Sequence, residues 1–184
     1  MTNPFTAGDA LLIVDVQNDF IPGGSLAVPD GDAVVPVLNT WIEHATEAGI
    51  PVIASRDWHP ADHVSFAEQG GLWPPHCVQD TAGADFHPDL RLPADAMIIS
   101  KADTTEKDAY SAFEDTGLAS TLKDLGVERV FVGGLALDYC VRASALDALE
   151  NGFEVHLIPD GSRAIDEEAG AAFVQELSEQ QAAV

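Results

Sequence analysis

Four chemically reactive side chains lie at the ends of apolar runs in this sequence. Asp15 closes the first run, Asp57 the second and Lys101 the third, and Cys140 follows the fourth. A thiol is a weak nucleophile at its ordinary pKa, so a cysteine hydrolase needs a base or a positive charge beside its sulfur. Asp15 and Lys101 supply these two groups, and the combination indicates nucleophilic catalysis by a cysteine.

Each of these residues also has a structural explanation when it is taken alone. Asp15 fits a turn or a helix cap, Lys101 fits a solvated surface, and Cys140 fits a small buried hydrophobe. For a single cysteine on an apolar helix, the structural explanation is the better one. Four such groups at four strand ends exceed what a hydrophobic core requires, and together they favour one reactive cleft.

Cys140 falls in the first turn of a helix that we expect over about residues 138–151. Unpaired N–H groups and the helix dipole at that end favour a thiolate. No histidine lies beside Cys140 in the sequence, so Asp15 is the predicted base and Lys101 the predicted cationic neighbour. The resulting hypothesis is an Asp–Lys–Cys catalytic set.

A second group of residues has the types and the spacing of a metal site. Asp57 and His59 lie on the same side of an extended segment, because side chains alternate there with period two. His76, which follows two prolines, is a third ligand that can complete one face of a divalent ion. Three ligands leave positions for water and substrate, which is typical of a catalytic site. Histidines in loops are more often solvated, and we therefore treat three others as surface or structural residues: His44, His87 and His156.

The elements that must position these groups alternate along the chain. Five β-branched apolar runs have the length of strands: residues 10–16, 51–57, 96–101, 129–135 and 154–160. Four further segments have helical patterns: about 31–48, 111–124, 138–151 and 166–180. The strands are apolar at consecutive positions, as expected where helices cover both faces of a parallel sheet. The alternation predicts one doubly wound α/β domain over residues 1–184.

In open parallel sheets, ligands bind in the crevice outside the carboxyl ends of the strands. The four reactive side chains all fall at such ends, so we expect them to share one cleft. The stretch from about 58 to 95 is rich in Pro, Gly, His and Trp and reads as a long loop. A connection of that length in a compact domain is usually functional.

The composition narrows the class of protein. With 31 acidic and 8 basic residues among 184, the chain has a formal net charge of −23. Such a charge repels phosphate backbones and anionic lipid, so we expect neither a nucleic-acid partner nor a membrane partner. The acidic residues are scattered rather than gathered in one tail, which resembles the surface of a protein from a salt-adapted, halophilic cell; an ordinary acidic enzyme is the alternative.

Two cysteines, Cys77 and Cys140, are too few for a disulfide framework in a chain of this length. The N-terminus lacks the basic and apolar regions of a secretory signal, and no apolar stretch has the length of a membrane span. We therefore expect a cytoplasmic protein with free thiols. Cys77 is expected to be a buried thiol, although a ligand or second nucleophile is an alternative.

Five blocks of sequence, taken together, resemble the nicotinamidases of the isochorismatase-like hydrolase superfamily. They are VDVQNDF (14–20), SRDWHPADHVSF (55–66), LWPPHCVQDTAGADF (72–86), SKADTTEKDAYSAF (100–113) and GGLALDYCVRASALDA (133–148). They occur in the family order and span about residues 9–165. The resemblance implies an isochorismatase-like hydrolase fold and the conversion of nicotinamide into nicotinate and ammonia, through a thioester, in NAD salvage.

The resemblance also implies a role for each site residue. Asp15, Lys101 and Cys140 are the implied catalytic triad, and Asp57, His59 and His76 the implied ligands of one divalent ion, with zinc first and iron or manganese as alternatives. His63 is an alternative ligand or lies behind the ligands. The implied oxyanion hole consists of the backbone N–H groups of Ala136 and Cys140, after a cis peptide bond that precedes Ala136. The implied substrate pocket is lined by Phe20, Trp73, Tyr110, Leu135 and Tyr139. Leu137 departs from the pattern, because relatives often carry a small polar residue there.

Several other functions remain as alternatives. Isochorismatases lack the nucleophilic cysteine, so Cys140 argues against them, and carbamoyl or ureido amidases keep the triad and are disfavoured less strongly. A phosphatase with Asp15 as nucleophile needs a second aspartate two residues on, where Gln17 stands. A non-catalytic metal-binding protein would explain the histidines but not Lys101 or Cys140. The implied partner is a small molecule, nicotinamide or also pyrazinamide, and homo-oligomers are common in the family.

Overall fold

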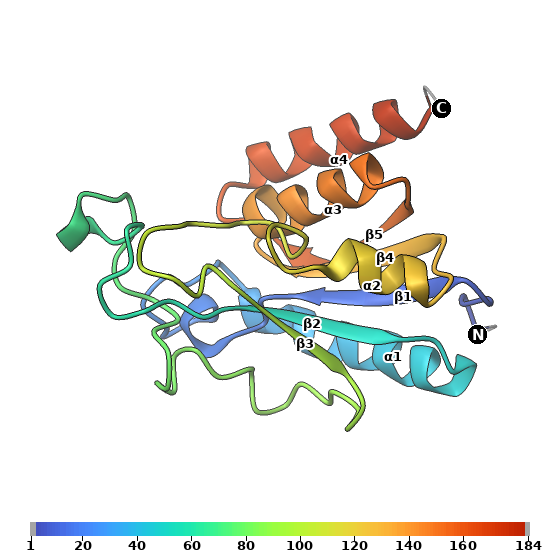
Figure 1. Cartoon of the computed structure of the whole chain (residues 1–184), viewed down its shortest axis with the longest axis horizontal. Helices are drawn as coiled ribbons and strands as arrows, with labels where there is room; N and C mark the ends of the chain where they lie inside the picture. Colours follow the sequence, from blue (N-terminus) through green and yellow to red (C-terminus); the bar gives the residue numbers. More distant parts are fainter. Residues whose placement is uncertain (1–2, 183–184) are drawn as a thin grey trace.

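A computed structural model of the chain describes residues 3–182, and they form one domain around a five-stranded parallel sheet (Figure 1). The strands are β1 Asp9–Val14, β2 Val52–Asp57, β3 Met97–Lys101, β4 Arg129–Leu135 and β5 Glu154–Arg163. Their order in the sheet is β3-β2-β1-β4-β5, and every neighbouring pair is parallel. The predicted doubly wound α/β class is confirmed.

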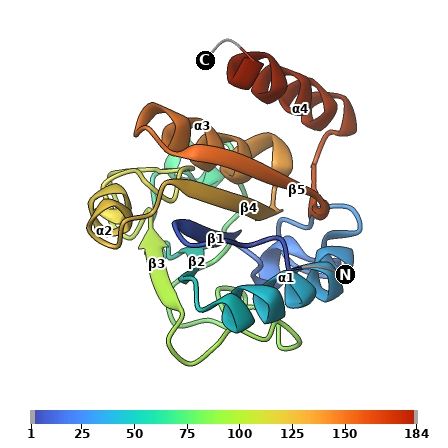
Figure 2. The ribbon, with the colours of Figure 1, turned by 90° about the vertical axis from the view of Figure 1, so that its right-hand side faces the viewer.

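Helices cover both faces of this sheet (Figure 2). They are α1 Val34–Ala48, α2 Leu118–Asp124, α3 Arg142–Glu150 and α4 Glu167–Ala182. α1 packs on one face, and α2, α3 and α4 pack on the other. β1 shows why its sequence is apolar throughout: Leu11 and Ile13 enter the core under α1, whereas Leu12 and Val14 enter the opposite core. All six residues of β1 are buried, as the consecutive apolar pattern predicts.

The strand order reverses between β1 and β4, because the chain builds outward to β3 first and then returns to the other side of β1. A crevice forms at such a switch point, outside the carboxyl ends of the two strands. Asp15 follows β1 and Cys140 follows β4, so they stand on opposite sides of this crevice. Asp57 and Lys101 are the last residues of β2 and β3.

Two predicted helices differ from the structure at their N-terminal ends. The helix expected over 111–124 is helical only from Leu118, because Asp115 and Gly117 have positive φ angles of 56° and 73° that interrupt any earlier helix. The helix expected from Asp138 is α3, and it is preceded by a π-helical turn, Leu137–Val141, which contains Cys140. Such turns are rare and often occur at functional sites.

The long loop predicted over 58–95 is present and contains only one short 3₁₀ turn, Ala67–Gln69. Much of it extends beyond the carboxyl ends of the strands (Figure 1). It is tied down by backbone hydrogen bonds, such as those from His59 N to Cys77 O (3.0 Å) and from Gln79 N to His59 O (2.8 Å). The loop therefore covers the end of the sheet at which the reactive side chains lie. Among residues 3–182, no helix has the length and apolar character needed to cross a membrane.

Candidate active site

Lys101 lies at the centre of the reactive side chains. Its Nζ is 2.8 Å from Asp15 Oδ2 and 3.5 Å from Cys140 Sγ, and it forms an ion pair with Asp57 Oδ1. To reach Asp15, which follows β1, the Lys101 side chain passes across the end of β2. All four residues are buried, with Asp15 at 0% exposure. The structure thus brings together the four side chains that the crevice rule assigned to one cleft.

Burial and neighbouring charges shift the pKa values of the groups in this cluster in different directions. Burial disfavours the ammonium of Lys101, but the Asp15 and Asp57 carboxylates outweigh that effect and hold its pKa well above the usual range. Burial raises the pKa of Asp15, and the nearby Lys101 only partly opposes this. For Asp57 the burial cost is outweighed by Lys101 and His59, which lower its pKa. Two carboxylates with opposite shifts have separate roles: Asp57 is held ionised, and Asp15 is poised to take a proton.

Cys140 is a thiol in the resting site, because burial raises its pKa well above the ordinary value despite the nearby Lys101. The N-terminal position in a helix, which favours a thiolate, is therefore outweighed by burial. Attack by the sulfur then requires a base in contact with it. Asp15 Oδ2 is the one buried side-chain oxygen within residues 3–182 without a well-aligned hydrogen bond, although Lys101 lies close to it. That oxygen is available as the proton acceptor.

Ser55 is a site residue that the sequence analysis missed. Its hydroxyl is fully buried and donates a hydrogen bond of 2.6 Å to Asp15 Oδ1. Asp15 has a positive φ angle of 48°, which turns its side chain away from the line of β1. Ser55 therefore fixes the carboxylate oxygen that does not pair with Lys101. Only the parallel register of β1 and β2 brings the two residues together, so no local sequence signal marked Ser55.

The three predicted metal ligands also converge. One ligand atom each from Asp57, His59 and His76 lies within 4.8 Å of the other two, and His76 Nε2 is 3.8 Å from Asp57 Oδ2. The Nδ1 atoms of His59 and His76 are 3.0 Å and 2.8 Å from the backbone carbonyl oxygens of His76 and Pro74. Each Nδ1–H is therefore assigned as a donor, which leaves Nε2 free to bind a cation, as is usual for metal-binding histidines.

Burial lowers the pKa of His59 to about 4, against the opposing effect of Asp57, so its imidazole is neutral near pH 7. A neutral imidazole is the form that binds a metal ion. Two imidazole nitrogens and one carboxylate oxygen form a donor set that suits zinc and other first-row divalent ions. These residues therefore fit a catalytic metal site with an open face.

His63 is built into the site differently. Its Nδ1 accepts the backbone N–H of Ser65 (3.3 Å) and lies 2.7 Å from the Ser65 hydroxyl, and its Nε2 is 3.0 Å from Lys107 O. Both ring nitrogens are thus occupied within the protein, although His63 could be grouped with His59 and Asp108 as donors. His63 connects the two loops around the site and lies behind the ligands.

A cavity opens between Cys140 and the ligands. It encloses about 430 Å³ of empty space, its mouth included, and both Cys140 and the three ligands line it. Phe20, Trp73, Tyr110 and Tyr139 also line this cavity. The Trp73 indole N–H donates to the Tyr110 hydroxyl (3.0 Å), and Trp73 meets Tyr139 edge to face with ring centroids 5.3 Å apart. Flat apolar walls of this kind suit an aromatic ring.

Other lining residues differ from the prediction. Ala136 lies in the cavity wall, and the peptide bond between Leu135 and Ala136 is cis, as the resemblance implied. Leu135 itself does not line the cavity; it is fully buried in the core under α1. Five lining residues were not anticipated, and they come from loops that are distant in the sequence: Leu26, Ser65, Asp108, Ala109 and Ile165. Ser65, Asp108 and Ala109 fall within the quoted family blocks, but only the folded chain shows that they line the cavity.

Both cysteines are free, and they differ in surroundings. Cys77 is fully buried, and burial raises the pKa of its thiol far above the usual value. It does not line the cavity. The expectation of a buried thiol agrees with this environment.

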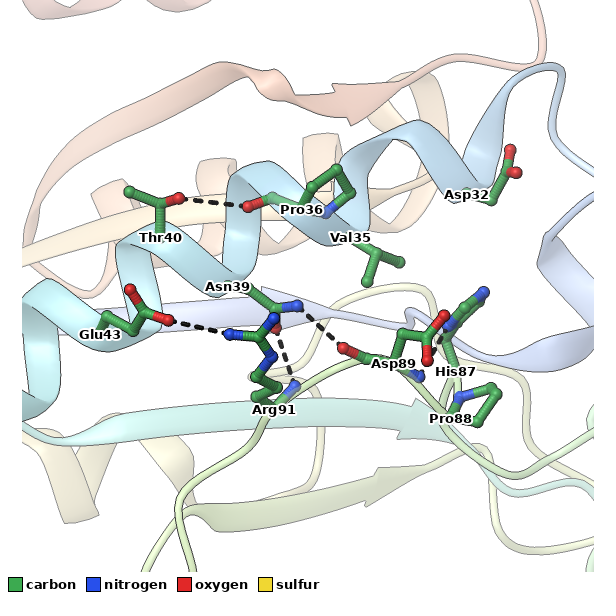
Figure 3. A pocket seen from close by; sticks show the side chains of 10 residues that line it. All are labelled: Asp32, Val35, Pro36, Asn39, Thr40, Glu43, His87, Pro88, Asp89 and Arg91. Carbon is green, nitrogen blue, oxygen red and sulfur yellow. Dashed lines mark hydrogen bonds and ion pairs between the residues drawn. The ribbon is translucent and has the colours of Figure 1, made fainter.

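A larger depression lies elsewhere, between α1 and the segment 87–91 (Figure 3). It contains about 1090 Å³ of space, and its lining includes three carboxylates: Asp32, Glu43 and Asp89. Asn39 fastens its two sides, since its side chain donates to Asp89 O and accepts from Arg91 N, both at 2.8 Å. None of the catalytic or ligand residues lines it, so size alone does not identify the reactive site.

Known proteins are similar to this chain in fold and in sequence. Residues 9–184 match the model of the isochorismatase domain, and the chain therefore belongs to the isochorismatase family. It is 44% identical over 178 residues to the nicotinamidase of Escherichia coli, a match that covers 85% of this chain and 84% of that protein. The predicted family membership is confirmed.

Solved structures agree with that assignment. The pyrazinamidase of Pyrococcus horikoshii in complex with zinc has 50% identity and a TM-score of 0.91, with 94% of this chain and 95% of that chain covered. The PnC1 protein of L. infantum in complex with nicotinate has 42% identity and a TM-score of 0.86, with 94% of this chain and 89% of that chain covered. Both similarities extend over almost the whole domain.

Proposed function

We propose that this chain hydrolyses nicotinamide to nicotinate and ammonia, as an amidohydrolase of pyridine-nucleotide salvage. One observation carries the proposal: Lys101 contacts both Asp15 and Cys140, whose reactive atoms lie within 4.8 Å of each other, and Cys140 lines a cavity that also presents three metal-ligand side chains and aromatic walls. The similarity to a nicotinamidase and to proteins solved with zinc and with nicotinate supports it.

Each chain group has a defined role in the proposed cycle. Asp15 Oδ2 takes the proton of the Cys140 thiol, and the sulfur forms a bond to the amide carbon. The tetrahedral intermediate then collapses with cleavage of the C–N bond, and Asp15 gives the same proton to the departing ammonia. A thioester on Cys140 remains. Asp15 removes a proton from water, the resulting hydroxide displaces the sulfur to form nicotinic acid, and Asp15 returns the proton to Cys140. The carboxyl proton of the product passes to solvent, which leaves nicotinate.

Lys101 stabilises negative charge at two places during this cycle. Its ammonium lies between the Asp15 carboxylate and the Cys140 sulfur, so it lowers the cost of charge on either atom. We assign the oxyanion to the backbone N–H groups of Ala136 and Cys140. A donor of this kind contributes about 3–4 kcal/mol to transition-state stabilisation.

The proposed metal is zinc, held by Asp57, His59 and His76, with iron or manganese as the alternatives. When bound there, it would supply a Lewis-acidic position that orients the nitrogen of a pyridine ring. The aromatic walls from Phe20, Trp73 and Tyr139 exclude water and fix the plane of that ring. The amide group would then be directed to Cys140.

A carbamoyl or ureido amide is the second candidate substrate, since the Asp–Lys–Cys chemistry is the same for that class. The aromatic walls favour a flat ring over an aliphatic carbamoyl group, and this observation ranks nicotinamide first. Pyrazinamide, with a second ring nitrogen in a similar shape, is a further expected substrate. A purely metal-binding protein is disfavoured because it would not require the buried ion pair of Lys101.

The test is ammonia release from nicotinamide at molar KCl, with zinc-loaded protein, with chelated protein and with the Cys140→Ala variant. We expect release that requires both the metal and Cys140. If folded, zinc-loaded protein releases no ammonia from nicotinamide but does so from a carbamoyl amide, the second candidate replaces the first. Metal-dependent release that survives in Cys140→Ala would contradict the proposed nucleophile.

A further inference from the structure

Residues 17–19, which begin three residues after the end of β1, contact both chain segments that carry the proposed metal ligands. We propose that Gln17 and Asp19 are positioning residues: they hold Asp57, His59 and His76 in register for a divalent cation that neither of them touches. This inference rests on the metal site of the proposed function. It assigns a role to two polar side chains that the reaction cycle itself does not use.

The side-chain amide of Gln17 makes the hydrogen bonds to β2 that a longer β1 would make with its backbone. β1 and β2 pair as far as Val14 and Ser55, and Asp15 then leaves the strand with a positive φ angle. The next residue of β2 whose backbone faces β1 is Asp57. Instead of a strand, the Gln17 amide pairs with it: Oε1 accepts the Asp57 N–H (2.9 Å) and Nε2 donates to Asp57 O (2.8 Å).

The amide of Gln17 is fully buried and also donates to Ala84 O at 2.9 Å, in the loop beyond His76. A buried amide with three hydrogen bonds has a defined orientation, and losing it leaves backbone groups unpaired. Gln17 therefore fixes the peptide of the Asp57 ligand and links it to the loop of the third ligand.

Asp19 fixes the loop segment that contains the ligand His76. Its Oδ2 accepts the backbone N–H of Cys77 at 2.7 Å, and Cys77 directly follows His76. Cys77 has a positive φ angle of 47°, which is unfavourable for a residue other than glycine and is maintained only where the surroundings fix it. The Asp19 carboxylate lies so close to Gly83 that a Cβ there would be 2.2 Å from Oδ2. The loop is thus shaped around this carboxylate.

The two histidine ligands are coupled through the same peptide. His59 N–H donates to Cys77 O at 3.0 Å, and His59 Nδ1 is 3.0 Å from His76 O. A displacement of Cys77 would therefore move His76 directly and His59 through its hydrogen bonds. Asp19 is the side chain that prevents this displacement. Neither Gln17 nor Asp19 lines the cavity, so their effect on a bound ion is positional.

Asn18 provides a matched control within the same turn. Its side chain donates to Ala82 O at 2.8 Å, so it also fastens the loop, but at a residue six positions beyond His76 rather than next to it. Loss of Asn18 and loss of Asp19 each remove a polar contact between residues 17–19 and the loop. Only the second loss frees Cys77.

The experiment measures the zinc affinity of metal-free protein by competition with a chromophoric chelator, together with the melting temperature of each metal-free variant. Asp19→Ala and Gln17→Met are expected to weaken zinc binding by about 10- to 100-fold, the usual effect of residues that orient metal ligands. Asn18→Ala is expected to bind zinc like the wild type. Asp19→Asn is expected to restore most of the affinity, because its amide oxygen still accepts the Cys77 N–H.

A third change keeps the inference testable if Asp19→Ala or Gln17→Met does not fold. Gly83→Ala leaves Asp19 in place but displaces its carboxylate, and it is expected to weaken zinc binding as well. Wild-type affinity in folded Asp19→Ala, Gln17→Met and Gly83→Ala would overturn the positioning role, and so would an equal loss in Asn18→Ala.

Zinc binding and ammonia release, measured on the same proteins, distinguish failure of the proposed function from failure of the positioning role. A wild-type protein that binds zinc tightly, loses it in Asp19→Ala and yet releases no ammonia from nicotinamide would contradict the function and support the positioning role. A wild-type protein that releases ammonia without binding any divalent ion would contradict the positioning role and leave amide hydrolysis standing.

Discussion

The two halves of the site are held in place by different means. Asp15 and Lys101 are fixed by the sheet, because each lies at or next to the end of a strand whose neighbours set its register. Cys140 lies in the π-helical turn Leu137–Val141, which begins two residues after β4. Of the metal ligands only Asp57 lies in a strand, and His59 and His76 belong to the long loop. The loop has no sheet to define it, so side chains such as Gln17 and Asp19 supply the hydrogen bonds that strands would otherwise supply.

This difference implies that substitutions in the two halves have different effects on turnover and on metal affinity. We call Asp15, Lys101 and Cys140 the strand-held half. A substitution there removes a reactive group from a rigid frame, and binding of the metal and of the pyridine ring should persist. We call the metal ligands Asp57, His59 and His76 the loop-held half. A substitution there displaces the ligands, and metal affinity should fall even where the stability of the fold is retained. Lys101 is the exception, since it contacts Asp15 in one half and Asp57 in the other.

Cys140→Ala tests the strand-held half by itself. We expect turnover of nicotinamide to fall by at least about 10⁴-fold, because removal of a nucleophile leaves only the other contributions of the site. Zinc affinity should be unchanged, and nicotinamide should still bind, as measured by calorimetry. Near-normal turnover would contradict the nucleophile assignment, and loss of zinc binding would contradict the separation of the two halves.

Lys101→Met tests the connection between the halves. It leaves Asp15 and Asp57 buried without their shared cation, and removal of one partner from a buried ion pair typically costs about 3–5 kcal/mol of folding free energy. The measurement is urea unfolding of metal-free protein. The control is Lys107→Met, whose ion pair with Asp115 is exposed, and which should cost at most about 1 kcal/mol. Equal effects would show that the buried network does not stabilise the fold.

Acidification tests the loop-held half through His59. In the folded, metal-free protein the pKa of His59 is about 4, below the value of about 6.5 for an unfolded chain. The unfolded state therefore takes up the proton first, and stability should fall as the pH drops from about 6.5 toward 4. The full effect is roughly 3 kcal/mol.

The measurement is the unfolding free energy of metal-free protein against pH, compared with the His59→Gln variant. The variant lacks this proton and should show a weaker decrease over the same range, whereas the carboxylates titrate in both proteins. Identical pH profiles would show that His59 is not held neutral by burial.

The same contrast explains what the sequence alone could establish. The strand-held residues were predictable, because consecutive apolar runs identify parallel strands and ligands bind at their carboxyl ends. Asp15, Asp57 and Lys101 follow from that rule without any relative. The ligand set in the loop needed the residue types and the family blocks as well, since nothing in a loop's periodicity says which histidines converge.

Other features depended on contacts that no local pattern encodes. Ser55 reaches Asp15 only through strand register, and His63 is occupied on both nitrogens by groups from two loops. The predicted helix over 111–124 lost its first half to backbone turns at Asp115 and Gly117. Leu135 was assigned to the pocket by its place in a motif, but alternation along β4 directs it into the core.

His76→Ala tests the loop-held half by ligand removal. Zinc affinity should fall by more than about 100-fold, because loss of a ligand exceeds the usual effect of an orienting residue. The matched control is His87→Ala, which changes a histidine of the same loop that lies at the separate depression near α1 (Figure 3) and should leave zinc affinity unchanged. Equal zinc affinity in the two variants would exclude His76 as a ligand.

Salt should affect both halves alike, and this is the smallest expected effect. Five of the eight basic residues form ion pairs with carboxylates in the described part of the chain: Arg91, Lys101, Lys107, Arg129 and Arg142. Most of the 31 acidic side chains thus repel one another without a basic partner there. The screening length shrinks from about 10 Å at 0.1 M salt to about 3 Å at 1 M, so repulsion weakens over this range.

We therefore expect the melting temperature to rise by several degrees between low and molar KCl, with NaCl at equal ionic strength as the control for specific potassium binding. Because the acidic residues are distributed over the whole surface, Cys140→Ala and His76→Ala should show the same increase as the wild type. A melting temperature that does not change with KCl would contradict adaptation of this surface to salt. An increase confined to wild type would instead mean that salt acts through the site, which would break the distinction between surface charge and the buried network around Lys101.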